Sequence, residues 1–152
     1  MVFRYQVYDN LLEQLTFENA SLCDTADYAL LPNGTVSVLN RERQDSVDGP
    51  ERALNGIATC PANAPPACAV QLDGVPVAAP YYIVQLGPLE QKQYQYGIVS
   101  DPFGLSLFIL ARNVTDYYAR FDAEVLAWCK AHGFTTPINA PLKTVQEGCT
   151  YW

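Results

Sequence analysis

The chain has 152 residues, of which 49% are apolar and 16% are charged, so its composition is that of a packed globular domain and not of a disordered segment. Its formal net charge is −7, with nine Lys and Arg against 16 Asp and Glu. Such an acidic chain is a poor electrostatic match for nucleic acid, so we expect no nucleic-acid partner. The length suits a single domain over residues 1–152.

No apolar run approaches the roughly 20 residues that a membrane helix needs. No secretion signal precedes the first apparent strand, "VFRYQVY". We interpret this as a shortened N-terminus, which leaves a signal or a membrane anchor upstream open. The oligomeric state is also left open.

Short segments rich in aromatic and β-branched residues follow one another through most of the chain, separated by turn residues such as the Pro-Asn-Gly of "ADYALLPNGTVSVLNRER". Serial strands joined by short turns predict an antiparallel meander. Eight such strands can close into an up-and-down barrel with room for one small ligand. The predicted fold class is therefore all-β, with a barrel over about 3–112. The expected strands are about 3–9, 25–31, 35–43, 52–59, 69–73, 81–86, 94–100 and 105–112.

After the last predicted strand the apolar period changes from two to 3.6 residues, in "TDYYARFDAEVLAWCKAHG". This predicts one helix over about 115–132, with Thr115 as its N-cap and Gly133 beyond its end. The remainder, 134–152, is interrupted by prolines and is expected to be an extended tail. The helix face expected to pack against the outside of the barrel carries Tyr118, Phe121, Val125 and Cys129.

The alternation within 35–43 places Val36, Val38, Asn40 and Glu42 on one face of the strand. This face is apolar at one end and polar at the other. One interpretation is a ligand pocket with an apolar floor and polar groups nearer its mouth. The other is a strand that frays into solvent at Asn40 and Glu42. Periodicity alone does not separate the two.

Five cysteines and three Asn-x-Ser/Thr triplets point to an oxidising, secretory setting. The triplets begin at Asn19, Asn33 and Asn113, all in apparent turns, and are candidate glycosylation sites. Cys60 and Cys68 flank a Pro-rich loop at the ends of adjacent strands, where the geometry of a disulfide can be met.

The order of "TFENASLC", "ADYALLPNGTVSVLNRE", "APYYIVQLGP", "YQYGIVSDP" and "LSLFILARN", followed by a helix and a late cysteine, resembles the lipocalin family. The resemblance runs from about residue 5 to 149 and is nearest to the apolipoprotein D-like and bacterial outer-membrane lipocalins. Two departures stand out. The second family motif, Thr-Asp-Tyr, is degenerate near "QLGPLEQKQYQY", and the first, Gly-x-Trp, falls on "VFRYQVY" with Arg4 in place of Trp. Because the family Trp packs against the arginine that ends the last strand, here Arg112, either Arg4 points outward or the true N-terminus differs.

The resemblance implies a calyx that holds a small hydrophobic molecule without covalent bonding. The candidates are a lipid, sterol, fatty acid, retinoid or carotenoid, or a tetrapyrrole. It also implies a disulfide between Cys23 and Cys149, which leaves Cys129 as an unpaired, buried thiol. The resemblance extends the choice of inward-facing residues from strand 35–43 to the other strands. On this basis Tyr82 and Val84 of strand 81–86 are expected to face inward. The ligand-binding residues expected on this basis are Tyr28, Val38, Asn40, Glu42, Leu72, Tyr82, Phe108 and Leu110.

The catalytic inventory is small, so we expect no enzyme, no metal and no cofactor. The one histidine, His132, lies a helical turn from Cys129, a spacing common by chance, and carboxylate pairs such as Asp9/Glu13 show no fixed catalytic spacing. Two alternatives remain. Loops such as "RQDSVDGPE" could bind a protein partner on a barrel scaffold, which a solid core would favour. An enzyme acting on a lipid or pigment would be favoured by a buried carboxylate with a strongly raised pKa beside the cavity.

Overall fold

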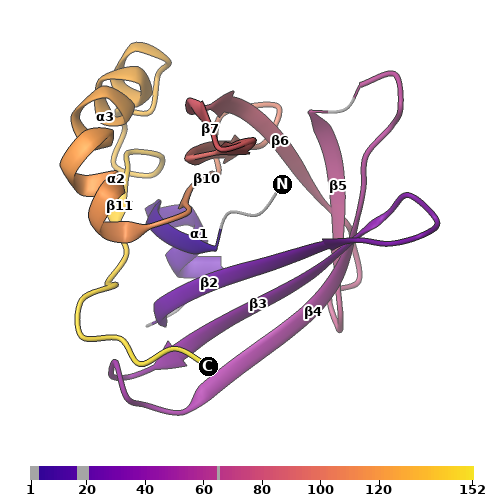
Figure 1. Cartoon of the computed structure of the whole chain (residues 1–152), viewed down its shortest axis with the longest axis horizontal. Helices are drawn as coiled ribbons and strands as arrows, with labels where there is room; N and C mark the ends of the chain where they lie inside the picture. The colour runs from indigo at the N-terminus through magenta and orange to yellow at the C-terminus, as the bar shows by residue number, and fades with distance from the viewer. Residues whose placement is uncertain (1–3, 17–20, 65) are drawn as a thin grey trace.

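The computed structural model describes residues 4–16, 21–64 and 66–152, and its main feature is an antiparallel barrel (Figure 1). The barrel strands are β1 (Tyr5–Asp9), β2 (Ser21–Leu30), β3 (Val36–Gln44), β4 (Glu51–Thr59), β5 (Ala67–Leu72), β6 (Ala79–Leu86), β9 (Tyr96–Ser100) and β10 (Leu107–Ala111). The other elements are the helices α1 (Leu11–Thr16), α2 (Val114–Arg120) and α3 (Asp122–Ala131) and the short strands β7 (Leu89–Glu90), β8 (Gln93–Tyr94) and β11 (Leu142–Lys143).

The barrel closes because the first and last of its strands pair, with Tyr5 opposite Ala111 and Gln6 opposite Leu110. Neighbouring strands are otherwise consecutive along the chain, except that the β7–β8 hairpin lies between β6 and β9. Bulges interrupt the pairing in β1, β2 and β6, and such bulges bend strands sharply enough to close a small barrel. The predicted eight-stranded up-and-down barrel is confirmed.

The predicted single helix is two helices that meet at Phe121, whose φ of −120° departs from helical geometry. The predicted N-cap, Thr115, is wrong. Asn113 fills that position, because its side-chain oxygen accepts a hydrogen bond from the Asp116 amide at 2.9 Å. Asparagine is among the strongest N-caps, so the helix begins earlier than Thr115 would allow.

The two helices cover one side of the barrel, opposite β5 (Figure 1). Their buried face packs on outward side chains of β1, β9 and β10, including Ile98 and Ile109, both 0% exposed. Tyr118 is only partly buried there, and Tyr117 is the residue buried deepest at that turn. No helix in the described part of the chain is long and apolar enough to cross a membrane. The helix-side core, which consists of Val7, Tyr8, Tyr96, Ile98, Leu107, Ile109, Ala111, Tyr117, Phe121, Val125, Cys129 and Phe134, thus lies outside the barrel.

The C-terminal tail is fixed to the barrel by pairing and by a disulfide. Its short strand β11 pairs with β1, and Cys149 is bonded to Cys23 of β2. A second disulfide joins Cys60 and Cys68 across the loop between β4 and β5. Cys129 is buried and unbridged, and burial raises the pKa of its thiol to about 11. The tail therefore runs back along the first strands of the barrel.

The unusual Arg4 and the strand-ending Arg112 have separate partners. The Arg4 guanidinium lies 3.5 Å from the Asp27 carboxylate and donates a hydrogen bond to the backbone oxygen of Trp152 at 3.1 Å. Arg112 instead donates from Nε to the Tyr94 carbonyl at 3.2 Å. Because Asp27 alternates with the inward-facing Tyr28, Arg4 lies on the outer face of the barrel, which is the first of the two arrangements that the sequence allowed.

Candidate functional site: a cavity inside the barrel

A cavity of about 420 Å³ lies inside the barrel, within the size range of small-molecule sites. Its wall is formed by side chains of the barrel strands together with Glu13 from α1 and the loop residues Val75, Asp101 and Ser106. Seven of the eight residues expected on the wall are found there, and they are Tyr28, Val38, Asn40, Glu42, Leu72, Phe108 and Leu110.

The eighth expected residue, Tyr82, does not line the cavity. Its neighbour Tyr81 does, and Val84 on the same face as Tyr82 is 39% exposed. The strand, "APYYIVQL", is apolar on both faces, so alternation does not show which face points into the barrel. The register that β6 takes against β5, with Cys68 opposite Tyr81, is set by tertiary pairing.

Most of the wall is apolar. Val38 and Val70 are buried and pack with Tyr28, Leu72 and Tyr81 into one cluster. A second cluster is built on Val99 and Leu110, and Phe108 packs against it. A molecule entering the cavity would therefore exchange water for aliphatic and aromatic contacts, which is the main source of binding free energy for a hydrophobic ligand.

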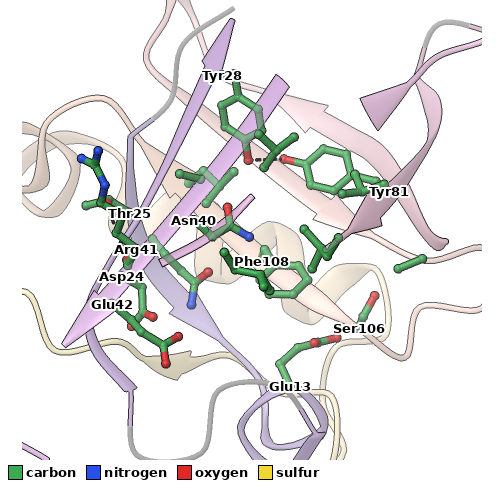
Figure 2. Close-up of a pocket in the computed structure, with 18 of the residues that line it drawn as sticks. Glu13, Asp24, Thr25, Tyr28, Asn40, Arg41, Glu42, Tyr81, Ser106 and Phe108 are labelled. Carbon is green, nitrogen blue, oxygen red and sulfur yellow. Dashed lines mark hydrogen bonds between the residues drawn. The ribbon is translucent and has the colours of Figure 1, made fainter. Parts of the chain in front are cut away.

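A pair of tyrosines lies at one end of the cavity (Figure 2). The hydroxyl oxygens of Tyr28 and Tyr81 are 2.9 Å apart, so one hydroxyl donates to the other. Burial raises the pKa of Tyr28 to about 12, and burial together with the facing Tyr28 raises the pKa of Tyr81 well above its ordinary value. Both side chains are therefore neutral hydrogen-bonding groups at physiological pH.

The carboxyl groups of Glu13, Asp24 and Glu42 lie away from the tyrosine pair (Figure 2), and Asp101 also lines the cavity. Glu13 comes from α1, Asp24 from β2 and Glu42 from β3. Glu13 and Asp24 are each only 5% exposed. The cavity thus has an apolar, aromatic end and an acidic end, and we call Glu13, Asp24 and Glu42 the carboxyl cluster.

Burial dominates the titration of the carboxyl cluster. It raises the pKa of Glu13 to about 7, helped by the negative charges of Asp9 and Asp101. Burial and the charge of Glu42 raise the pKa of Asp24 to about 7 as well, against a hydrogen bond that Ser21 donates at 3.2 Å. The pKa of Glu42 is raised by burial, although Arg52 at 3.1 Å opposes this effect.

Asn40 lies between the two ends of the cavity (Figure 2). In the described part of the chain its side-chain amide makes no hydrogen bond with another residue, so both its donor and its acceptor are available to a bound molecule. The polar half of 36–42 therefore faces the cavity, and the alternative that this strand frays into solvent does not hold.

Glu13, Asp24 and Tyr81 line the cavity and were not predicted from the sequence. A signal for Asp24 was present, because counting back in twos from Tyr28 reaches Ala26 and Asp24, and both line the cavity. Glu13 had no such signal, since it lies on a helix outside the strand pattern. Its position follows from the cap that Asn10 provides, which accepts a hydrogen bond from the Glu13 amide at 3.1 Å.

The remaining predicted positions lie away from the cavity. Asn33 is exposed in the β2–β3 turn, where its side chain accepts a hydrogen bond from Thr35, and Asn113 is exposed at the start of α2. Asn19 falls outside the described residues. His132 stacks on Trp128 with ring centroids 3.9 Å apart, at the end of α3. In the described ranges no three His, Cys, Asp or Glu residues are grouped so as to hold a metal ion.

Comparison with known proteins identifies the family. The sequence model of the lipocalin-like domain matches residues 14–140, so the chain belongs to the lipocalin-like domain family. A search of curated protein sequences found no match.

Solved structures share the fold at low sequence identity. Lobster apocrustacyanin A1 is 19% identical with a TM-score of 0.64, over 95% of this chain and 76% of that one. Apocrustacyanin C1 is 20% identical with a TM-score of 0.66, over 97% of this chain and 78% of that one. Japanin from Rhipicephalus appendiculatus, solved bound to cholesterol, is 14% identical with a TM-score of 0.63, over 95% of this chain and 92% of that one.

Proposed function

We propose that this protein binds and carries a small hydrophobic molecule non-covalently inside the barrel. The observation that carries the proposal is the cavity of about 420 Å³, whose wall is mostly apolar and also carries hydrogen-bonding groups such as Asn40 and the two tyrosine hydroxyls. That combination is typical of ligand sites, in which apolar contact supplies affinity and a few polar groups fix orientation. A scaffold that acts only through its loops would not need it.

The proposed ligands remain those of the family resemblance: a lipid, sterol, fatty acid, retinoid or carotenoid, or a tetrapyrrole. Japanin, with the same fold, holds cholesterol, which supports a ligand of comparable size and polarity here. The proposed binding residues are the seven expected wall residues together with Tyr81. We also propose, from the sequence motifs alone, that the chain is nearest to the apolipoprotein D-like lipocalins.

The test is native mass spectrometry combined with organic extraction, on protein purified from a eukaryotic secretion host. We expect a small molecule at one per chain that is lost on denaturation and recovered in the extract. Ligand-free protein that also rejects fatty acids, sterols and pigments in titration would contradict the proposal and would favour binding through the loops.

A second candidate, an enzyme acting on a lipid or pigment, has one observation in its favour. Glu13 and Asp24 have pKa values near 7 beside the cavity, a range suited to general acid–base chemistry. Carriage is preferred because members of this family are typically binding proteins. Analysis of the recovered molecule separates the two, since carriage returns the added ligand unchanged and an enzyme returns a product.

We also propose that the protein is secreted. Two disulfides are typical of proteins folded in an oxidising compartment. Asn33 and Asn113 are exposed, as glycan acceptors must be. Expression in secreting cells, with Asn33→Gln and Asn113→Gln as variants, tests this. A glycosidase-sensitive mass that each variant reduces would support the proposal, and an unmodified intracellular product would contradict it.

A further inference from the structure

The carboxyl cluster consists of acidic side chains from three separate elements, α1, β2 and β3, that lie on the part of the cavity wall away from the tyrosine pair (Figure 2). Burial of a carboxylate without a cation is costly, and nearby carboxylates repel one another. A purely hydrophobic ligand would give no reason for buried carboxyl groups at one end of an apolar cavity. The cluster therefore requires a partner or a proton.

The cations of the described chain pair with only one member of the cluster. Arg52 pairs with Glu42 at 3.1 Å. Arg41 also borders the cavity, but its guanidinium pairs with Asp27 at 3.8 Å and with Glu51 at 3.6 Å. These pairs leave Glu13 and Asp24 without a cationic partner among the described residues.

Glu13 has the fewest partners of the three acids, although it is only 5% exposed to solvent. Its carboxyl group accepts no hydrogen bond and makes no ion pair with any described residue, and its wall position faces the cavity (Figure 2). Asp24 accepts a hydrogen bond from Ser21, a neutral donor, and one from its own backbone N–H, and it makes no ion pair with a described residue. An unpartnered, buried carboxyl that lines a cavity is an open acceptor site for a ligand.

We infer that the carboxyl cluster binds a protonated amine, so that the preferred ligand is an apolar molecule with one cationic amino group. This inference rests on the proposed function and narrows its ligand class. A primary ammonium offers three N–H donors on a compact charge, which suits an unpartnered, buried carboxyl such as that of Glu13. Its positive charge relieves the repulsion between the carboxylates, whereas an anionic head group adds to it.

The rest of the cavity suits the apolar part of such a ligand. Phe108 and Leu110 form the wall between the two ends, and the Tyr28–Tyr81 pair lies at the far end. An amine seated on Glu13 therefore places its chain or ring system along the aromatic wall, with Asn40 alongside it. Apolar contact supplies affinity, and the ion pair sets orientation and selects charge.

The experiment compares three ligands that share one chain and differ in their head group: dodecylamine, dodecanol and dodecanoate. Each competes with a neutral, environment-sensitive apolar dye at neutral pH, below its micelle concentration. Because hydrogen bonds to charged groups contribute about 1.5–3 kcal/mol, we expect the amine to bind about 10–100-fold more tightly than the alcohol. Dodecanoate should bind more weakly than the alcohol.

Matched variants tie the preference to the cluster. Glu13→Gln should bring the amine and alcohol affinities together by about tenfold by weakening amine binding, and Asp24→Asn should do so by less. Glu147→Gln is the control, because it removes the same charge from an exposed position in the tail. It should leave the preference for the amine unaltered.

The outcomes separate this inference from the proposed function. Dodecanol or dodecanoate binding as tightly as dodecylamine to the unmodified protein overturns the inference and leaves ligand carriage standing. An amine preference that Glu147→Gln reduces as much as Glu13→Gln also overturns it, because the effect is then one of overall charge. Failure of all three ligands and the dye to bind overturns the proposed function itself.

Discussion

Tyr28 and Tyr81 are 53 positions apart in the chain, yet their hydroxyl oxygens meet 2.9 Å apart inside the barrel. The rings lie 6.5 Å apart between centroids and belong to β2 and β6. This contact joins strands that are not neighbours in the sheet. The contact therefore holds two facing walls of the cavity at a fixed separation, and it also forms a hydrogen bond at that end of the cavity.

The hydroxyl pair predicts a coupled effect on stability. Tyr28→Phe leaves the Tyr81 hydroxyl without its partner and should lower the free energy of unfolding by about 1 kcal/mol. Tyr81→Phe should do the same, and the double variant should cost less than the sum of the two, because no unpaired hydroxyl remains. Denaturant unfolding of the ligand-free protein measures all four states. Strictly additive costs would show that the two hydroxyls do not interact in solution.

The position of Phe108 predicts loss of ligand uptake on substitution. Phe108→Asp places a charge on the apolar wall and should abolish binding of a neutral apolar dye, while the protein remains folded and secreted. Phe103→Asp is the matched control, since Phe103 lies in the β9–β10 loop and is 84% exposed. Fluorescence titration of both variants is the measurement. Equal dye affinity in Phe108→Asp and the unmodified protein would mean that dye binds elsewhere.

The two disulfides are predicted to contribute unequally. Cys23 and Cys149 are separated by 126 positions and Cys60 and Cys68 by eight. In the chain-entropy treatment, replacing the first pair by serine should lower the free energy of unfolding by about 4–5 kcal/mol, and replacing the second by less than about 3 kcal/mol. Denaturant unfolding of the two double-serine variants tests the order. A larger loss from the short loop would show that the tail is not held by its bridge.

The carboxyl cluster predicts that the ligand-free protein loses stability as pH rises. Glu13 has a pKa of about 7 in the folded protein against 4.5 ordinarily, so the folded state binds more protons than the unfolded state between these values. The free energy of unfolding should therefore fall as pH rises between these two pKa values, by roughly 1.4 kcal/mol for each pH unit crossed. Asp24 contributes with the same sign.

Charged groups near Glu13 and Asp24 could change the direction of this pH dependence. Glu13 faces Asp9 and Asp101, and Asp24 faces Asp9 and Glu42. All are acidic, so none reverses the sign. Thermal melts across this pH range should show a flatter profile for the combined variant Glu13→Gln and Asp24→Asn. An unchanged slope in that variant would place the titrating groups elsewhere.

The fold was predictable because each of its signals is local. Turn residues such as Pro32-Asn33-Gly34 and alternation on either side of them mark the strands, and Gly34 takes the left-handed φ of 84° that the turn requires. The change of period after Arg112 marks the helical region. Alternation also placed Asn40 and Glu42 correctly on the face of Val38.

The residues of the cavity wall were predictable only in strands whose two faces differ in polarity. In β3 one face is mixed and the other carries arginines, so the inward set is defined. In β6 both faces are apolar, and the choice between Tyr81 and Tyr82 depends on register with β5. Glu13 depends on how α1 lies against the barrel, which is a matter of tertiary packing and leaves no periodic trace in the sequence.

The helix-side core makes the barrel wall unequal in thickness around its circumference. On β10 the outward Ile109 is 0% exposed beneath the helices, whereas on β4 and β5 the outward Ile57 and Gln71 meet solvent. Outward bending of β4 and β5 would therefore displace only water. Movement of β10 would require the helices to separate from the barrel. If the barrel carries the proposed ligand, the double-layered side would define the shape that the ligand has to match, and the single-layered side would define the largest ligand that fits.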